Sequence, residues 1–156
     1  MILALDISLN TGWALGAAGC NAFGTRVFSG LNGDDIRVGR RFKAWVDSML
    51  DEHKPEALAL ERPFYKHRGP SFLLIGLNWE AQRSAEERGI ARVEYSVQSI
   101  KSHLAGDARA DKPAMVKAAR LRGYNVGTDH EADAIGILLL HQHKTRPIDE
   151  PAPTLF

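Results

Sequence analysis

Four residues that can bind metal ions or transfer protons stand where regular structure is expected to begin or end. Asp6 follows the apolar run 2–5, and Glu61 follows the apolar run 57–60, a pattern typical of buried strands. His130 and Asp133 are three residues apart on an expected helix, so they share one face. Three carboxylates and an imidazole suit Mg²⁺ or Mn²⁺. Two such ions about 4 Å apart can hydrolyse a phosphodiester bond.

Each of these residues also has an ordinary structural interpretation. Asp6 could cap the turn that follows it, and His130 could be a solvated residue in the first turn of its helix. Asp133 precedes a long apolar run, where an unpaired carboxylate would be costly. Thr128 and Glu131 have the spacing of a capping box, so we assign Glu131 to the start of the helix and not to catalysis.

The elements that must position these residues follow from hydrophobic periodicity and turn signals. The expected strands span residues 2–7, 12–18, 23–30, 57–61 and 91–95. The expected helices span residues 35–53, 71–88, 97–104, 111–122 and 129–143. Short turns predict that the first three strands are antiparallel. The helix before strand 57–61 predicts a right-handed crossover to a parallel strand, which brings Glu61 to the edge that carries Asp6 if the two strands pair.

Composition indicates one domain, residues 1–143, followed by an extended proline-containing tail, residues 144–156. The single cysteine, Cys20, excludes an intramolecular disulfide and a cysteine-based zinc site, and it favours a reducing compartment. The chain lacks the ~20 consecutive apolar residues of a membrane span, so we expect a cytoplasmic protein without a membrane partner. The net charge of +1 conceals clusters of basic residues that could bind nucleic acid, although net charge does not decide this.

The order of these motifs resembles the RuvC family of Holliday-junction resolvases, within the ribonuclease H-like fold. The resemblance rests on Asp6 with the Thr11-Gly12-Trp13 turn, on Glu61 with Phe64, on Lys101 and Lys112, and on His130-Glu-Ala-Asp133. It implies an α/β fold in which helices flank a five-stranded mixed sheet. It also implies a homodimeric endonuclease with two Mg²⁺ ions per site, replaceable by Mn²⁺, that cuts four-way DNA junctions by paired nicks. Such an enzyme would act at the nucleoid, or in a host cytoplasm if a virus encodes it.

The resemblance also implies roles for individual residues. The metal ligands would be Asp6, Glu61, His130 and Asp133, with Lys101 and Lys112 as further catalytic residues that contact phosphate. The other implied DNA contacts are Phe64, Tyr65, Lys66 and Arg68. Aromatic rings among basic residues can stack on unpaired bases, whereas the alternatives are rings that cover the core beneath a loop and lysines that are simply solvated.

Helix 71–88 is apolar on more than one face, which predicts a second partner besides the sheet. Its apolar residues are Phe72, Leu73, Leu74, Ile75, Leu77 and Trp79. We expect a homodimer through this helix, because a symmetric junction suits two sites related by a twofold axis.

Other functions remain compatible with parts of the sequence. The same fold and metals could serve a nuclease of broader specificity for branched DNA or RNA–DNA hybrid. A junction-binding protein without catalysis would not need Asp6, Glu61 and Asp133 together. An ATP-binding module related to actin or sugar kinases is disfavoured, because no glycine directly follows Asp6 and no second phosphate-binding hairpin is present.

Overall fold

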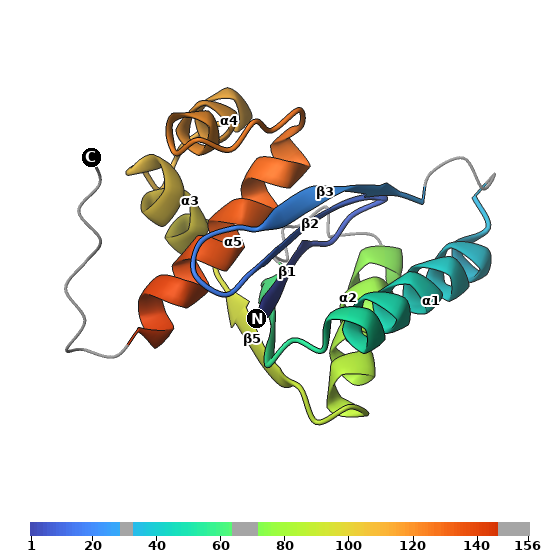
Figure 1. The fold of residues 1–156 in the computed structure, drawn as a ribbon. Coiled ribbons are helices and arrows are strands. Elements are labelled where there is room, and N and C mark those ends of the chain that lie inside the picture. The colour runs from blue at the N-terminus through green and yellow to red at the C-terminus, as the bar shows by residue number, and fades with distance from the viewer. Residues whose placement is uncertain (29–32, 64–71, 147–156) are drawn as a thin grey trace.

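The computed structural model describes residues 1–28, 33–63 and 72–146, which form a mixed five-stranded sheet between two layers of helices (Figure 1). The strand order is β3-β2-β1-β4-β5. The strands are β1 (Ile2–Asp6), β2 (Asn10–Gly16), β3 (Ala22–Val27), β4 (Ala57–Glu61) and β5 (Ala91–Tyr95). Strand β2 is antiparallel to both β1 and β3, whereas β4 is parallel to both β1 and β5. This confirms the expected fold, including the pairing of the strands that end in Asp6 and Glu61.

Helices cover both faces of the sheet. Helices α1 (Asp35–His53) and α2 (Phe72–Glu86) form one layer, and α3 (Val97–Ala105), α4 (Lys112–Leu121) and α5 (Asp129–Thr145) form the other (Figure 1). Helix α5 lies directly on the sheet, where it packs against β1 and β2, and α3 and α4 pack on its outer side. No helix among the described residues is both long enough and apolar enough to cross a bilayer.

Side chains of different size fill the two cores. Leu3, Leu5, Leu58 and Leu60 point toward α1 and α2, whereas the intervening positions of the same strands point toward α5. Those intervening positions are Ile2 and Ala4 in β1, with Ala57 and Ala59 in β4. Successive strand residues face opposite sides of a sheet, so the two buried faces explain why the strands are apolar throughout.

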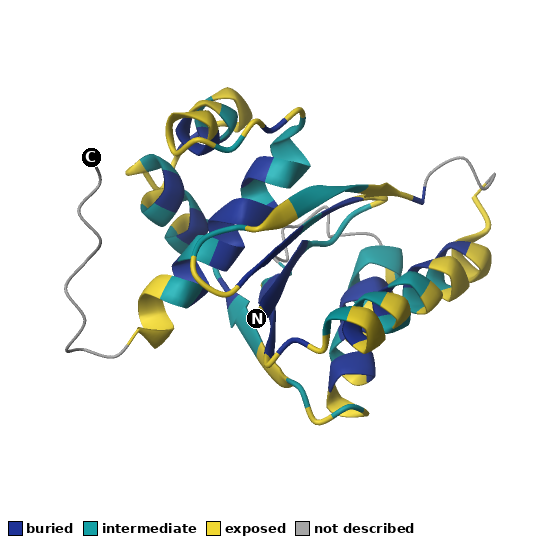
Figure 2. Ribbon diagram, in the orientation of Figure 1, coloured by how far each residue is buried: buried dark blue, intermediate teal, exposed yellow. Residues whose placement is uncertain are grey.

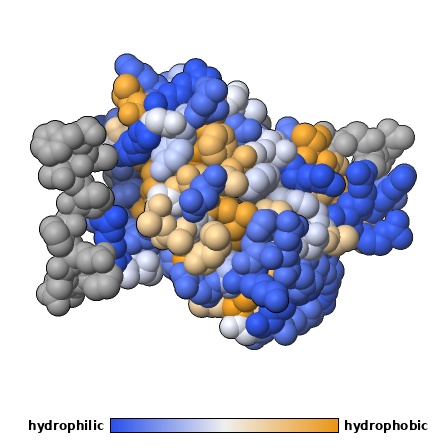
Figure 3. Space-filling view, in the orientation of Figure 1, coloured by the Kyte–Doolittle hydropathy of each residue, from blue (hydrophilic) through white to orange (hydrophobic). Residues whose placement is uncertain are grey.

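The outer helix α1 shows how the sequence sets a helix on this sheet. Asp34 caps its N-terminus by accepting a hydrogen bond from the backbone N–H of Arg37. Phe42, Val46 and Leu50 recur along the buried face, as an amphipathic helix requires. Figure 2 shows buried residues along the inner side of α1 and exposed residues along its outer side. In Figure 3 the side of α1 that faces the viewer is mostly hydrophilic.

Some observed boundaries differ slightly from those expected. Helix α5 continues to Thr145, so the first two residues of the expected tail belong to this helix. The Thr145 hydroxyl donates a hydrogen bond to the carbonyl oxygen of His141, one turn earlier. Strand β2 begins at Asn10, two residues early. The remainder of the tail, the expected end of the third strand at residues 29–30 and residue 71 of the expected second helix lie outside the described residues.

Candidate active site

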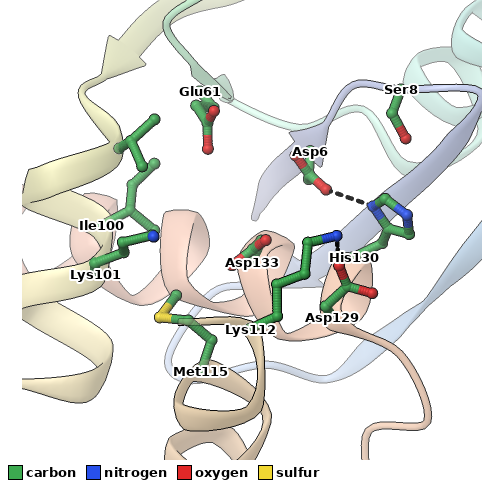
Figure 4. Close-up of a pocket in the computed structure, with 11 residues that line it drawn as sticks. Asp6, Ser8, Glu61, Ile100, Lys101, Lys112, Met115, Asp129, His130 and Asp133 are labelled. Atoms are coloured by element: carbon green, nitrogen blue, oxygen red, sulfur yellow. Dashed lines mark hydrogen bonds and ion pairs between the residues drawn. The ribbon is translucent and has the colours of Figure 1, made fainter. Parts of the chain in front are cut away.

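The carboxylates of Asp6 and Glu61 lie on the face of the sheet that α5 covers, because each stands two residues beyond an alanine of that face. Ala4 precedes Asp6 in β1 and Ala59 precedes Glu61 in β4, and these two alanines are paired neighbours in the parallel ladder. Alternation therefore turns both acids toward α5. They line a cavity of about 240 Å³ together with the two α5 residues expected at the site, His130 and Asp133. Figure 4 shows these side chains around the pocket.

The start of α5 is fixed by the capping box that the sequence predicts. The Thr128 side chain accepts a hydrogen bond from the Glu131 backbone N–H, while the Glu131 side chain accepts one from the Thr128 N–H. This arrangement satisfies N–H groups at the helix start. It confirms Glu131 as a cap residue and places His130 in the first turn, with Asp133 one turn further along.

Close backbone approach brings the start of α5 to the end of β1. Gly12 in β2 is the register partner of Asp6, and a Cβ atom at Gly12 would lie 3.2 Å from the Cα of His130 and still closer to its carbonyl group. A side chain at this position would therefore separate the strand from the helix. The absence of a side chain at Gly12 therefore allows α5 to pack closely against the end of β1, which carries Asp6.

A hydrogen bond joins the first strand to the last helix inside the pocket. Nδ1 of His130 lies 2.9 Å from Oδ2 of Asp6. This contact raises the pKa of His130, chiefly through the hydrogen bond to Asp6, because a carboxylate partner favours the protonated ring. The pair requires a proton on Nδ1, and in the neutral ring Nε2 is then the acceptor.

The other two carboxylates carry an electrostatic cost. Burial raises the pKa of Glu61 to about 7, and repulsion from Asp6 and then Asp133 adds to the effect. Burial likewise raises the pKa of Asp133 to about 7, with further contributions from Asp6 and Asp129. Strongly raised carboxyl pKa values in a cleft are a physical signature of a functional site. A bound cation would relieve both the desolvation and the repulsion.

Both expected lysines reach the same pocket, from two different helices. Lys101 of α3 and Lys112 of α4 are among its lining residues, as are the apolar side chains of Ile100 and Met115. Lys112 forms an ion pair with Asp129. Positively charged side chains beside an acidic site can bind a phosphate and stabilise the negative charge that develops on it.

Two polar lining residues were not anticipated from the sequence. Ser8 and Asp129 both face the pocket. Asp129 is the first residue of α5, where acids are common because they complement the helix dipole, so the sequence held no signal that separated it from an ordinary first-turn residue. Ser8 lies in the turn after β1, where serine is equally common. The expected DNA contacts Phe64, Tyr65, Lys66 and Arg68 lie outside the described residues.

The donor set fits a hydrated hard cation. Among the described residues, no three His, Cys, Asp or Glu side chains converge on a single point as a closed metal cage would require. Asp6, Glu61 and Asp133 instead surround a shared pocket. Mg²⁺ keeps several water ligands and is usually held by one or two carboxylates together with substrate phosphate. Carboxylate oxygens around an accessible space therefore suit it better than they suit a fully protein-ligated ion.

The strand order, the layer of helices on each face and the carboxylate pocket define a ribonuclease H-like protein. The fold resembles that of Thermus thermophilus RuvC in complex with a Holliday-junction substrate, with a TM-score of 0.74, 22% identity, and coverage of 90% of this chain and 91% of that one. The model of the family described as crossover junction endodeoxyribonuclease RuvC matches residues 30–141. The chain belongs to the RuvC family, whose members are metal-dependent nucleases.

Two relatives illustrate the extent of the similarity. The crossover junction endodeoxyribonuclease RuvC of Parvibaculum lavamentivorans is 26% identical over 151 residues, which cover 90% of this chain and 85% of the relative. The protein of the same name from Marinobacter nauticus is 30% identical over 141 residues, which cover 83% of this chain and 80% of the relative. Similarity therefore extends through both layers of helices.

Proposed function

We propose that this chain is a structure-selective endonuclease that resolves four-way DNA junctions by hydrolysing phosphodiester bonds in paired nicks. The observation that carries the proposal is a pocket shared by Asp6, Glu61 and Asp133, with Lys101 and Lys112 also lining it. Carboxylates suit metal-assisted hydrolysis, and lysines suit the phosphate that is cut. Family membership and the Holliday junction named with the structural relative support a four-way junction as substrate.

The proposed cofactor is Mg²⁺, with Mn²⁺ as a substitute and two ions per site. Asp6, Glu61 and Asp133 would supply oxygen ligands, and His130 would supply a nitrogen ligand. Ions of this kind, when bound, lower the pKa of water and stabilise the leaving oxygen. The raised carboxyl pKa values support this assignment, because the pocket holds more buried negative charge than its own lysines neutralise.

The remaining steps depend on the chain's own groups. Asp6 orients the His130 ring through the 2.9 Å hydrogen bond. Lys101 and Lys112 approach the pocket from α3 and α4, and we assign to them the binding of the reacting phosphate. The proposal keeps Phe64, Tyr65, Lys66 and Arg68 as contacts to junction DNA, since they follow Glu61 in the chain within three to seven residues.

The proposal includes a homodimer through α2. Phe72 is 91% exposed and Trp79 is 72% exposed, while Ile75 is partly buried between them. These three residues are spaced three and four apart, so they share one helix face, and Leu77 points inward and is buried. Large exposed apolar groups on one stripe support a partner surface. A twofold dimer would present two pockets to the two strands that are cut.

Cleavage of labelled DNA in Mg²⁺ tests the proposed activity. The wild-type protein is expected to cut a four-way junction faster than three-way, flap and RNA–DNA hybrid substrates. Asp133→Asn should abolish cleavage while it leaves junction affinity within several-fold, because it removes a metal ligand and not a phosphate contact. Asp107→Asn is the matched control, since Asp107 lies in an exposed loop outside the pocket.

Two results would change the conclusion. Cleavage by Asp133→Asn at the wild-type rate would show that the carboxylate pocket does not take part in the reaction. Equal rates on all branched and hybrid substrates would replace four-way junction resolution with a broader nuclease activity in the same pocket.

A further inference from the structure

An ion pair crosses the rim of the pocket between the first residues of two helices. Nζ of Lys112, at the start of α4, pairs with Oδ2 of Asp129, at the start of α5. Figure 4 shows the lysine side chain extending over the pocket, with its ammonium group beside Asp129 and close to His130. The Lys112 side chain is 74% exposed and that of Asp129 only 24%, so the carboxylate has less freedom to move than the ammonium group.

The fold does not need Asp129 to start α5. The Thr128 and Glu131 side chains already satisfy backbone N–H groups at that end of the helix. An ion pair with so exposed a lysine contributes little to stability. The ion pair instead restricts the position of the Lys112 ammonium group, because a lysine on an exposed helix start otherwise samples many rotamers.

We propose that Asp129 is a positioning residue that holds the ammonium group of Lys112 over the pocket before DNA arrives. The inference rests on the proposed function, in which Lys112 contacts the phosphate that is cut. A lysine ammonium group has three donors, so the pairing with Asp129 leaves donors for phosphate oxygens. The negative field of Asp6 and Asp133 also acts on Lys112 and favours the same location above the carboxylates.

The substitution Asp129→Asn separates placement from binding. It removes a negative charge from the rim that DNA approaches, so junction affinity measured by fluorescence anisotropy in chelator should stay equal or become tighter. The turnover rate kcat should nevertheless fall roughly tenfold, because the phosphate contact is no longer held in place. Asp129→Glu keeps the carboxylate and should recover part of kcat.

A double-mutant cycle tests whether Asp129 acts through Lys112. In a Lys112→Met background, which keeps a side chain of similar length without the charge, Asp129→Asn should cause no further loss of kcat. A purely structural effect of Asp129 would lower kcat by the same factor in both backgrounds. Urea unfolding of each variant shows whether the fold is retained, and Asp129→Ser, which also removes the charge, serves if Asp129→Asn does not fold.

The outcomes separate this inference from the proposed function. Wild-type cleavage combined with an unchanged kcat in Asp129→Asn, or with equal losses in both backgrounds, would overturn the role of Asp129 alone. Failure of the wild-type protein to cut the junction in Mg²⁺ would overturn the proposed function and, with it, this role. A tenfold loss of kcat that disappears in the Lys112→Met background, with metal-free binding preserved, supports both.

Discussion

Replacing Glu61 by glutamine should stabilise the metal-free protein at alkaline pH while it abolishes metal-dependent cleavage. Burial and the neighbouring Asp6 and Asp133 carboxylates raise the pKa of Glu61 from its ordinary value of 4.5 to about 7. The ionised carboxylate is therefore less stable in the folded protein than in the unfolded chain. Glutamine has nearly the same shape and carries no charge, so it removes this cost.

The size and sign of the effect follow from proton linkage. Between pH 4.5 and about 7 the folded protein holds a proton on Glu61 that the unfolded chain has lost, so the free energy of unfolding falls as pH rises through this window. Each pH unit is worth ~1.4 kcal/mol, so the full displacement amounts to ~3 kcal/mol. The Glu61→Gln variant should thus exceed the wild type by ~3 kcal/mol at pH 8, and by less than ~1 kcal/mol at pH 5.

Urea unfolding in chelator at pH 5 and pH 8, followed by circular dichroism, measures this difference. Adding Mg²⁺ at pH 8 should then stabilise the wild type more than the variant, because only the wild type retains the full ligand set. Glu87→Gln is the matched control, since Glu87 is exposed in the turn that follows α2 and does not line the pocket; its effect should stay within ~0.5 kcal/mol. A Glu61→Gln variant less stable than wild type at pH 8 would refute the electrostatic argument.

Three further predictions concern the fold, a buried histidine and the proposed dimer. Gly12→Ala should lower the free energy of unfolding by ~1–3 kcal/mol and slow cleavage, because its Cβ would displace His130. Gly39→Ala is the control: the space around its Cβ is open, so it should stabilise α1 by ~0.5–1 kcal/mol. Urea unfolding measures both changes. Burial lowers the pKa of His141, so the contribution of this residue to the free energy of unfolding should fall as pH drops below ~6.5, where the unfolded chain takes up a proton first. The difference in stability between wild type and His141→Gln should therefore change between pH 7 and pH 5 in urea unfolding. Trp79→Lys should give folded monomers in sedimentation, and a wild-type monomer at micromolar concentration would refute the dimer.

The sequence was sufficient to predict the architecture and to predict that Asp6, Glu61, His130 and Asp133 lie close together. Apolar runs that end in Asp6 and Glu61 defined two buried strands, and the helix between these strands implied their parallel pairing. The Thr128 and Glu131 spacing located the start of the last helix to within a residue. These features depend on local periodicity and on chain connectivity, both of which are visible in a single sequence.

Contacts between side chains distant in the chain could not be predicted in the same way. The hydrogen bond of His130 to Asp6 joins residues 124 positions apart, and its formation depends on how closely α5 approaches β1. The pairing of Asp129 with Lys112 depends on the relative placement of the starts of α4 and α5. No periodicity encodes such distances, because they follow from the packing of whole elements.

The different side-chain sizes on the two faces of the sheet explain where the candidate active site lies. Leucines such as Leu5 fill the space under α1 and α2, whereas Ala4 and Ala59 lie under α5. Short side chains allow a helix to approach a sheet closely, and protein interiors leave little free space. Beyond these alanines the strands end in Asp6 and Glu61, so a closely packed α5 brings its own acid into the same pocket. The repulsion that results is opposed by the packing of both cores, which is why a site that destabilises itself can persist in a folded protein. An enlarged side chain at Ala59 would therefore impair cleavage through the position of α5, without altering any ligand.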